Sequence, residues 1–104
     1  MGSYSSGIAY AGSAVAEKYK VVWWENSGVA DNITQRGFKY LFRFGITGSN
    51  LGESQARIIN ELVAEKLGVD PKELKIALIY EDSAYGTSVA DGMQAEAERL
   101  GLNI

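Results

Sequence analysis

The stretch that decides the fold is KIALIYEDSAYG, residues 75–86, whose last residue begins a helix-forming segment at 86–100. Residues 75–80 are mostly apolar and form the clearest strand pattern of the sequence. Residues 81–85 form the loop after it. Apolar side chains then recur at three- and four-residue spacing, which predicts a helix over 86–100 that ends at Gly101. The inward-facing positions of this helix are expected to be Val89, Ala90, Met93, Ala97 and Leu100.

The same alternation of helix and strand is found near the start of the chain. Residues 6–18 favour a helix, and the apolar run 21–24 predicts a strand after it. Trp23 and Trp24 point to opposite faces of that strand, and both are expected in the core. The helix is expected to face the core with Ile8, Ala11, Val15 and Tyr19.

A second strand and a long helix are predicted in the middle of the chain. Aromatic and branched residues dominate 38–46, which favours a strand. The polar segment after it supplies Ser49 or Asn50 to cap a helix over 51–67. Gly68 lies where a left-handed residue ends a helix.

This alternation predicts an α/β fold with a parallel sheet. Three strands make a small sheet, and parallel strands usually need both faces covered. The sequence opens on a helix and stops where another strand should begin, so the sheet is expected to be incomplete, as in a piece of a larger protein. Exposed strand edges favour pairing with a second copy, which makes a homo-oligomer one expected state.

Composition excludes several classes of protein. The absence of Cys and His removes disulfides, thiol chemistry, Cys/His zinc sites and imidazole-based catalysis. A net charge of −3 argues against nucleic-acid binding, which needs a basic face. No apolar run approaches the roughly 20 residues of a membrane span. Residues 1–6 lack the basic and apolar regions of a secretory signal, so no signal peptide is expected in this sequence.

Three segments carry candidate binding chemistry. The segment 2–7 precedes a helix, where backbone amides and Ser hydroxyls can hold a carboxylate or phosphate, or simply cap the helix. Glu25 and the pair Glu81–Asp82 follow predicted strands, and they can bind an ammonium group or a metal, or be solvated loop residues. Tyr85 offers an aromatic platform with a hydroxyl, or packs as an ordinary residue at a helix start.

The chain resembles the type I periplasmic solute-binding proteins of branched-chain amino-acid ABC transporters. The resemblance rests mainly on two runs, ITQRGFKYLFR at 33–43 and IALIYEDSAYG at 76–86. Weaker matches lie at 2–6, at 15–18 leading to Val21, and from Ser27 onward. Order and spacing hold over nearly the whole sequence.

The resemblance implies a periplasmic-binding-protein type I sheet, flavodoxin-like and incomplete in this chain. Residues 1–44 would be part of lobe one up to a hinge crossing, and 45–104 the first βα units of lobe two. Such proteins bind a solute outside the inner membrane, deliver it to an ABC permease, catalyse nothing and need no cofactor or metal. The alternative function is a ligand-sensing regulatory domain of the same fold. An enzyme of flavodoxin-like or response-regulator-like build is a weaker alternative, because fold similarity alone does not carry function.

The resemblance also implies which residues bind the ligand. Ser6 matches the serine that holds an amino acid's carboxylate together with nearby amides, and Tyr85 matches a tyrosine that packs on the ligand. Ser27, Gly28 and Val29 match a loop that supplies backbone contacts, although Val29 stands where a hydroxyl is common and Val22 where a proline is common. The acidic group for the ligand's ammonium would come from a part of the family pattern outside this sequence. Because a clamshell site needs both lobes, this sequence alone is expected to bind no amino acid tightly.

Overall fold

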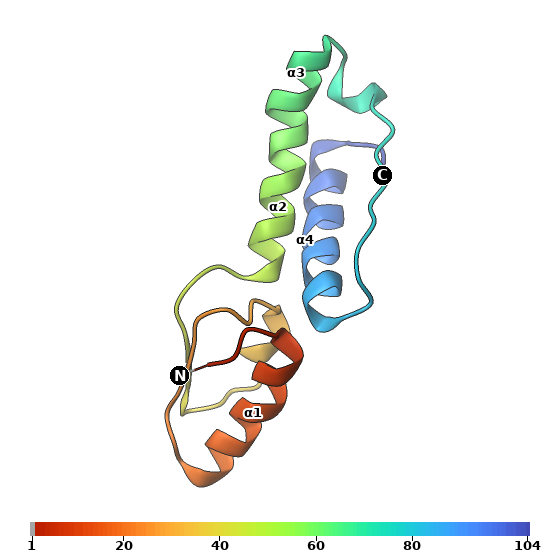
Figure 1. The fold of residues 1–104 in the computed structure, drawn as a ribbon. Helices are drawn as coiled ribbons and strands as arrows, with labels where there is room; N and C mark the ends of the chain where they lie inside the picture. The colour runs from red at the N-terminus through yellow and green to blue at the C-terminus, as the bar shows by residue number, and fades with distance from the viewer. Residues whose placement is uncertain (1) are drawn as a thin grey trace.

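A computed structural model describes residues 2–104 and shows an elongated molecule of about 55 × 22 × 20 Å. One group of elements contains α1 and a small sheet, and the other is built on a pair of long helices (Figure 1). The elements in chain order are α1 (Ser6–Tyr19), β1 (Trp23–Glu25), the 3-10 turn η1 (Asp31–Ile33), β2 (Leu41–Arg43), α2 (Gly48–Ile58), the π-helical turn η2 (Ile59–Val63), α3 (Ala64–Leu67), the 3-10 turn η3 (Pro71–Glu73) and α4 (Ala84–Leu100).

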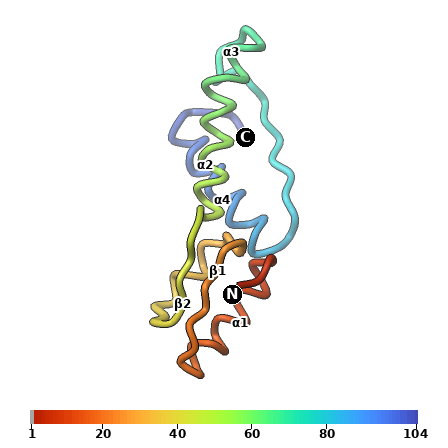
Figure 2. The backbone as a smooth tube through the Cα atoms, turned by 60° about the vertical axis from the view of Figure 1, so that its left-hand side comes forward, coloured from red at the N-terminus to blue at the C-terminus, as the bar shows by residue number. Residues whose placement is uncertain are grey.

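The first group packs α1 against a two-stranded parallel sheet. Strands β1 and β2 pair in register, with Trp23 beside Leu41 (Figure 2). The small core of this group is made by Ala9, Ala30 and Ile33, with Leu41 and Ala84 packed on it. Both strands are shorter than the predicted 21–24 and 38–46, because backbone pairing is confined to three positions on each strand.

The second group is built on the close contact between α2 and α4. A Cβ atom added to Gly52 would overlap the backbone of Val89 and Met93, and one added to Gly92 would overlap the backbone of Ser49. These two glycines therefore let the helix backbones touch. The core beside this contact consists of Ala56, Met93, Ala97 and Leu102.

The helix boundaries follow the capping signals closely. Gly68 and Gly101 end helical segments with φ of 67° and 74°, as predicted. The expected cap at Ser49 or Asn50 is wrong by two or three residues, since Thr47 is the N-cap and forms a reciprocal capping box with Asn50. The predicted helix 51–67 is a continuous helical segment that begins earlier, at Gly48, and contains the π-helical turn η2.

The strand predicted at 75–80 is wrong for this structure. Lys75 forms an isolated parallel bridge with Asn103, and 76–80 lie outside every strand of the described residues. Ile76 and Leu78 still pack against the core of the second group, whereas the side chain of Ile79 is 93% exposed. The segment keeps the alternation of a strand, but no neighbouring strand within residues 2–104 pairs with 76–80.

The predicted inward face of α1 is also wrong. Ile8, Val15 and Tyr19 are exposed, and the helix buries small residues at Ser6, Ala9 and Ser13 instead. The prediction of two core tryptophans fails as well, because Trp24 is half exposed and stacks on Phe42 on the outer face of the sheet. Large apolar side chains on this face have no covering layer within residues 2–104.

The two groups are connected by residues 44–47 and by polar contacts around η1. The Gly48 N–H donates to the Val29 carbonyl at 2.7 Å. The Asp31 carboxylate accepts hydrogen bonds from the Ser49 N–H and the Ser88 hydroxyl, at 3.0 and 2.7 Å. Within 2–104, none of the helices has the length and apolar character required to cross a membrane.

Candidate functional site

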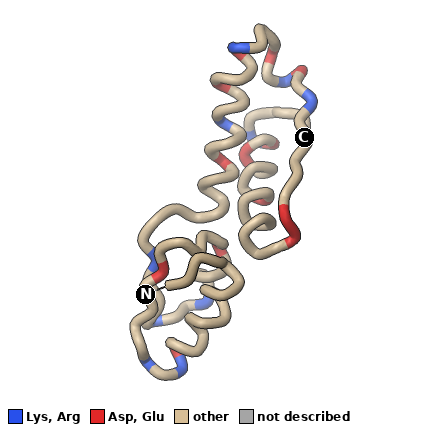
Figure 3. The backbone as a smooth tube through the Cα atoms, viewed as in Figure 1, with Lys and Arg blue, Asp and Glu red and all other residues tan. Residues whose placement is uncertain are grey.

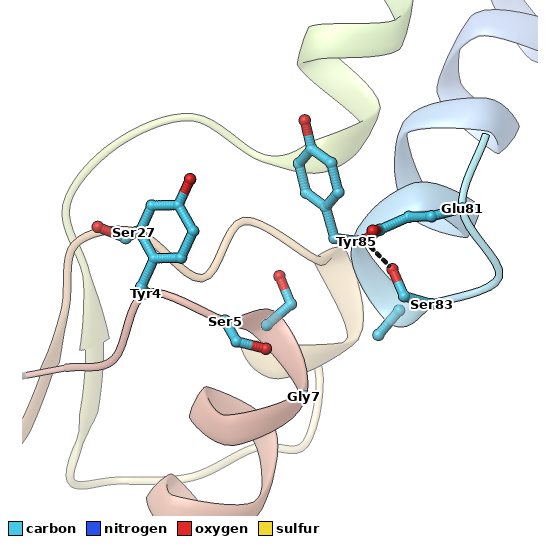
Figure 4. A pocket seen from close by; sticks show the side chains of 9 residues that line it. Tyr4, Ser5, Gly7, Ser27, Glu81, Ser83 and Tyr85 are labelled. Atoms are coloured by element: carbon cyan, nitrogen blue, oxygen red, sulfur yellow. Dashed lines mark hydrogen bonds between the residues drawn. The ribbon is translucent and has the colours of Figure 1, made fainter. Parts of the chain in front are cut away.

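A cavity of about 500 Å³ lies where the start of α1, the loop after β1 and the start of α4 meet. Figure 4 shows side chains from these three segments around the cavity. Residues that are far apart in the sequence therefore share one space. The lining residues are Tyr4, Ser5, Ser6, Gly7, Ser27, Glu81, Ser83, Ala84 and Tyr85.

The start of α1 supplies hydrogen-bond donors to one wall. The first N–H groups of a helix have no partner within the helix, and Ser5, the N-cap, makes no side-chain capping bond. The side chain of Ser6 is buried, and its oxygen accepts a hydrogen bond from the Ala30 N–H at 3.2 Å. The Ser6 hydroxyl can still donate its own hydrogen. This wall therefore combines the positive end of a helix with a fixed hydroxyl group, which is suited to an anion.

The three residues predicted from the loop after β1 have different positions. Ser27 lines the cavity, whereas Gly28 and Val29 are absent from its lining. Gly28 is buried against Ala9, and a Cβ atom at Gly28 would stand 2.7 Å from that alanine's Cβ. Val29 contributes its carbonyl to the contact with Gly48. Gly28 and Val29 thus hold the loop in place behind the wall.

The start of α4 forms the opposite wall. Tyr85 and Tyr4 present aromatic rings to the cavity, from α4 and from the segment before α1 (Figure 4). Ser83 caps α4 by accepting the Gly86 N–H at 3.1 Å, and its hydroxyl also donates to the carboxylate of Glu81. Ser83 was not singled out by the sequence reasoning, although a serine before a helix is a recognisable capping signal.

Charge around this cavity is unevenly distributed. Of the side chains that line it, Glu81 alone is charged. Figure 3 shows the acidic segment that leads into α4, where Glu81 and Asp82 follow each other. A negative group on the α4 side and helix amides on the α1 side favour a ligand that carries both a cationic and an anionic group.

Glu25 is neither a ligand for an ammonium or a metal nor a solvated loop residue, so both expectations for it are wrong. Its side chain is fully buried. It accepts hydrogen bonds from the Trp23 indole, from the backbone N–H of Ser3 before α1 and from backbone N–H groups of the loop after β1. Burial by itself raises the pKa of Glu25, but the hydrogen bonds from Gly28, Ser27, Trp23 and Ser3 outweigh it and lower that pKa. Among residues 2–104, no three acidic side chains come together as a metal site.

A second, smaller cavity of about 310 Å³ lies beside the contact between η1 and α4. Asp31 is shared between this cavity and the polar contacts that connect the two groups of elements. Burial raises the pKa of Asp31, but hydrogen bonds from Ser49 and Ser88 and the charge of Arg43 lower it overall. Both of these hydrogen bonds are accepted by Oδ1 of Asp31.

Comparison with known proteins gives consistent relatives. No family model matches the chain. The chain is 42% identical over 103 residues to Leu/Ile/Val-binding protein homolog 8 of Brucella abortus (strain 2308), and 43% identical over 103 residues to homolog 7 of the same strain. Each alignment covers 99% of this chain and 26% of the relative, so the chain spans about a quarter of these proteins.

Solved structures confirm the fold class. An ABC transporter substrate-binding protein from Desulfitobacterium hafniense superposes with a TM-score of 0.74 at 17% identity, and its complex with Leu with a TM-score of 0.77 at 18% identity. Both superpositions cover 99% of this chain and 28% of the other. The chain thus has the α/β fold of part of a type I periplasmic-binding protein, with a parallel sheet of two strands.

Proposed function

We propose that this chain supplies part of the binding site of an extracytoplasmic solute-binding protein for branched-chain amino acids. The proposal is supported by the chain's alignment, over 99% of its length, with about a quarter of the length of each Leu/Ile/Val-binding protein homolog. The observation that carries the proposal is the cavity in which Ser6, Ser27 and Tyr85 meet from three separate segments. Residues 1–44 belong to one lobe and 45–104 to the other, with the ligand between them. No catalysis is part of this function.

The cavity walls match the chemistry of an amino acid. The start of α1 holds the ligand's carboxylate through its free amides and the Ser6 hydroxyl. Glu81 attracts the ammonium group from the α4 side by its charge, in addition to the acidic group that the family resemblance implies outside this sequence. The rings of Tyr4 and Tyr85 offer apolar area to an aliphatic side chain. Gly28 and Val29 take part through the loop that they hold, and Ser27 adds a hydroxyl to the wall.

The proposed partner and location of the whole protein are based on the similar solved structures. Solved structures with this fold are described as substrate-binding proteins of ABC transporters. A binding protein of this kind works outside the inner membrane and delivers its ligand to the permease. The proposal accordingly includes delivery to a permease, a location outside the inner membrane and a branched-chain amino acid as ligand.

The proposal is tested by two-dimensional ¹⁵N–¹H NMR of the 104-residue chain during titration with L-leucine. We expect chemical-shift changes at the amides of residues 4–7, 27 and 83–86. These changes should saturate only at millimolar leucine, because a cavity open to solvent buries little of the ligand. L-Leucinamide, which lacks the carboxylate, should shift the amides at the start of α1 much less. 4-Methylpentanoate, which lacks the ammonium group, should shift those around Glu81 much less.

Two serine variants sharpen this test. Ser6→Ala removes a hydroxyl from the wall, and we expect weaker leucine binding and a loss of about 1 kcal/mol of stability from the bond to Ala30. Ser54→Ala is the matched control, because Ser54 is exposed on α2 and bonds only its own helix. Shifts scattered away from the cavity, or equal effects of the two variants, would contradict the proposal. Sub-micromolar affinity would contradict the expectation that the site needs more than this chain.

A further inference from the structure

We infer that Glu25 is a positioning residue that sets ligand affinity by tying together two walls of the cavity. This inference rests on the proposed function, because it concerns the same site. Glu25 does not line the cavity and cannot touch a ligand there. It acts through the backbone of the residues that do.

The two carboxylate oxygens of Glu25 serve different segments. Oε2 accepts hydrogen bonds from the Ser3 N–H at 3.3 Å and the Trp23 indole N–H at 2.9 Å. Oε1 accepts from three consecutive backbone N–H groups of the loop after β1, at 2.8 to 3.1 Å. Five donors therefore converge on one side chain that is 0% exposed. The donors to Oε1 are Asn26, Ser27 and Gly28.

Each oxygen thereby holds one wall of the cavity. Ser3 leads directly into Tyr4, Ser5 and Ser6, which line the cavity at the start of α1. Ser27, bound to the other oxygen, lines it from the loop. Gly2 packs so closely on Glu25 that a Cβ atom at Gly2 would overlap the carboxylate. The spacing between the two walls is consequently set by the span of one carboxylate group.

An ionised carboxylate is the one side chain of this size that meets these requirements. It accepts at both oxygens and donates nothing, so all five N–H groups find a partner. Glutamine has the same shape but presents an NH₂ group to one set of donors, and that set loses its acceptor. Aspartate is one methylene shorter and cannot reach both walls. Nearby Arg43 and Asp31 also carry charge, but their polar bonds are to other groups.

The test compares Glu25→Gln with Glu96→Gln in the 104-residue chain. Glu96 is a matched control because it is another buried glutamate with hydrogen-bonded partners, and it lies between α2 and α4, away from the cavity lining. We expect Glu25→Gln to weaken L-leucine binding by about tenfold, because the walls lose their preorganisation. Glu96→Gln should change leucine affinity less than twofold, even where it lowers the melting temperature as much.

A milder variant covers the case in which Glu25→Gln does not fold. Trp23→Phe keeps an aromatic ring but removes the indole donor to Oε2. We expect an intermediate loss of leucine affinity, with the largest amide shifts at residues 3–6. Leucine affinity equal to wild type in folded Glu25→Gln or Trp23→Phe would overturn the inference.

A ligand-free readout separates this inference from the proposed function. In Glu25→Gln, the ¹⁵N heteronuclear NOE should fall together at residues 3–6 and 26–28, while Glu96→Gln leaves both segments ordered. If wild type shows no leucine shifts, the proposed function fails, and the inference about affinity fails with it. The NOE data then still decide whether Glu25 couples the two walls, and unchanged order in both segments would refute that coupling.

Discussion

Single charged residues in this chain are fixed by the donors around them. Glu96 is buried between α2 and α4, where it accepts hydrogen bonds from Arg99 and Arg57. These bonds from Arg99 and then Arg57 lower the pKa of Glu96 from 4.5 to about 2. A second bridge from Arg57 to Glu53 is longer, at 3.7 Å. Glu96 is therefore the ionic link between the two long helices.

Acid is expected to weaken this link. A carboxyl group whose pKa is lowered in the folded state stabilises the fold fully above its unfolded pKa of about 4.5, and that contribution is lost as the pH falls toward 2. Melting temperatures measured by circular dichroism should thus fall between pH 5 and pH 2 in wild type. The melting temperature of Glu96→Gln should fall less steeply over the same pH range. The remaining fall comes from Glu25 and Asp31, whose pKa values are also lowered. Identical pH profiles for both proteins would contradict this role of Glu96.

Ser6 and Glu25 show what could be predicted for single residues. From residue types alone, the segment 2–7 before a helix indicates either an anion site or an ordinary cap. The family resemblance points to Ser6, Ser27 and Tyr85 as ligand-binding residues, and this assignment stays a prediction. Glu25 was misjudged because a carboxylate after a strand is ordinarily solvated. Its burial depends on a loop that folds back to present three N–H groups, and this conformation is not encoded in any local pattern.

At the scale of elements, the contact between α2 and α4 depends on glycine. Gly52→Ala places a methyl group against the backbone of Val89 and Met93. We expect a loss of about 1–3 kcal/mol, because overpacking pushes the helices apart. Chemical denaturation in urea measures this change.

Gly7→Ala is the matched control for this prediction. Gly7 is also helical, but the nearest atom to its added Cβ would be the Ser5 Oγ at 3.8 Å. Alanine there should raise the free energy of unfolding by about 0.5–1 kcal/mol through helix propensity. A Gly52→Ala protein as stable as wild type would show that the helices do not need the close approach.

Helices in this chain were easier to predict than strands, for a physical reason. A helix satisfies its own backbone hydrogen bonds, so its ends can be predicted from local signals. Gly68 and Gly101 each end a helix where the sequence predicts. A strand needs a neighbour, and 76–80 lack one among residues 2–104 although their apolar pattern is the clearest in the sequence. The inner face of α1 is wrongly predicted because it too depends on neighbouring elements: the small residues of this helix pack closest to the loop and the sheet.

At the scale of the whole molecule, the outer face of the sheet exposes large apolar side chains. Trp24 and Phe42 stack there with ring centroids 6.4 Å apart and are 49% and 48% exposed. Such a face, together with open strand edges, favours association with a second copy. We therefore expect light scattering to give a mass above the 11.3 kDa of the monomer, and this mass should decrease on dilution.

Substitution of the two rings tests this expectation. The double variant Trp24→Thr and Phe42→Thr keeps strand propensity but removes the apolar face, and it should be monomeric over the same concentrations. Tyr19→Gln is the control, because Tyr19 is an exposed aromatic residue that belongs to α1 and not to the paired strands. Wild type that stays monomeric at every concentration would contradict the expectation.

The arrangement of the cavity also bears on how the chain folds. Its lining residues Ser6, Ser27 and Tyr85 come from segments far apart in the sequence. Beside it, the bond between Ser88 and Asp31 joins α4 to η1 across 57 positions. Contacts of this kind close large loops and carry an entropic cost that local helix formation avoids. The helices should accordingly gain protection from hydrogen exchange before Ser6, Ser27 and Tyr85 come together. During synthesis, a ribosome must therefore release α4 before any recognition surface exists.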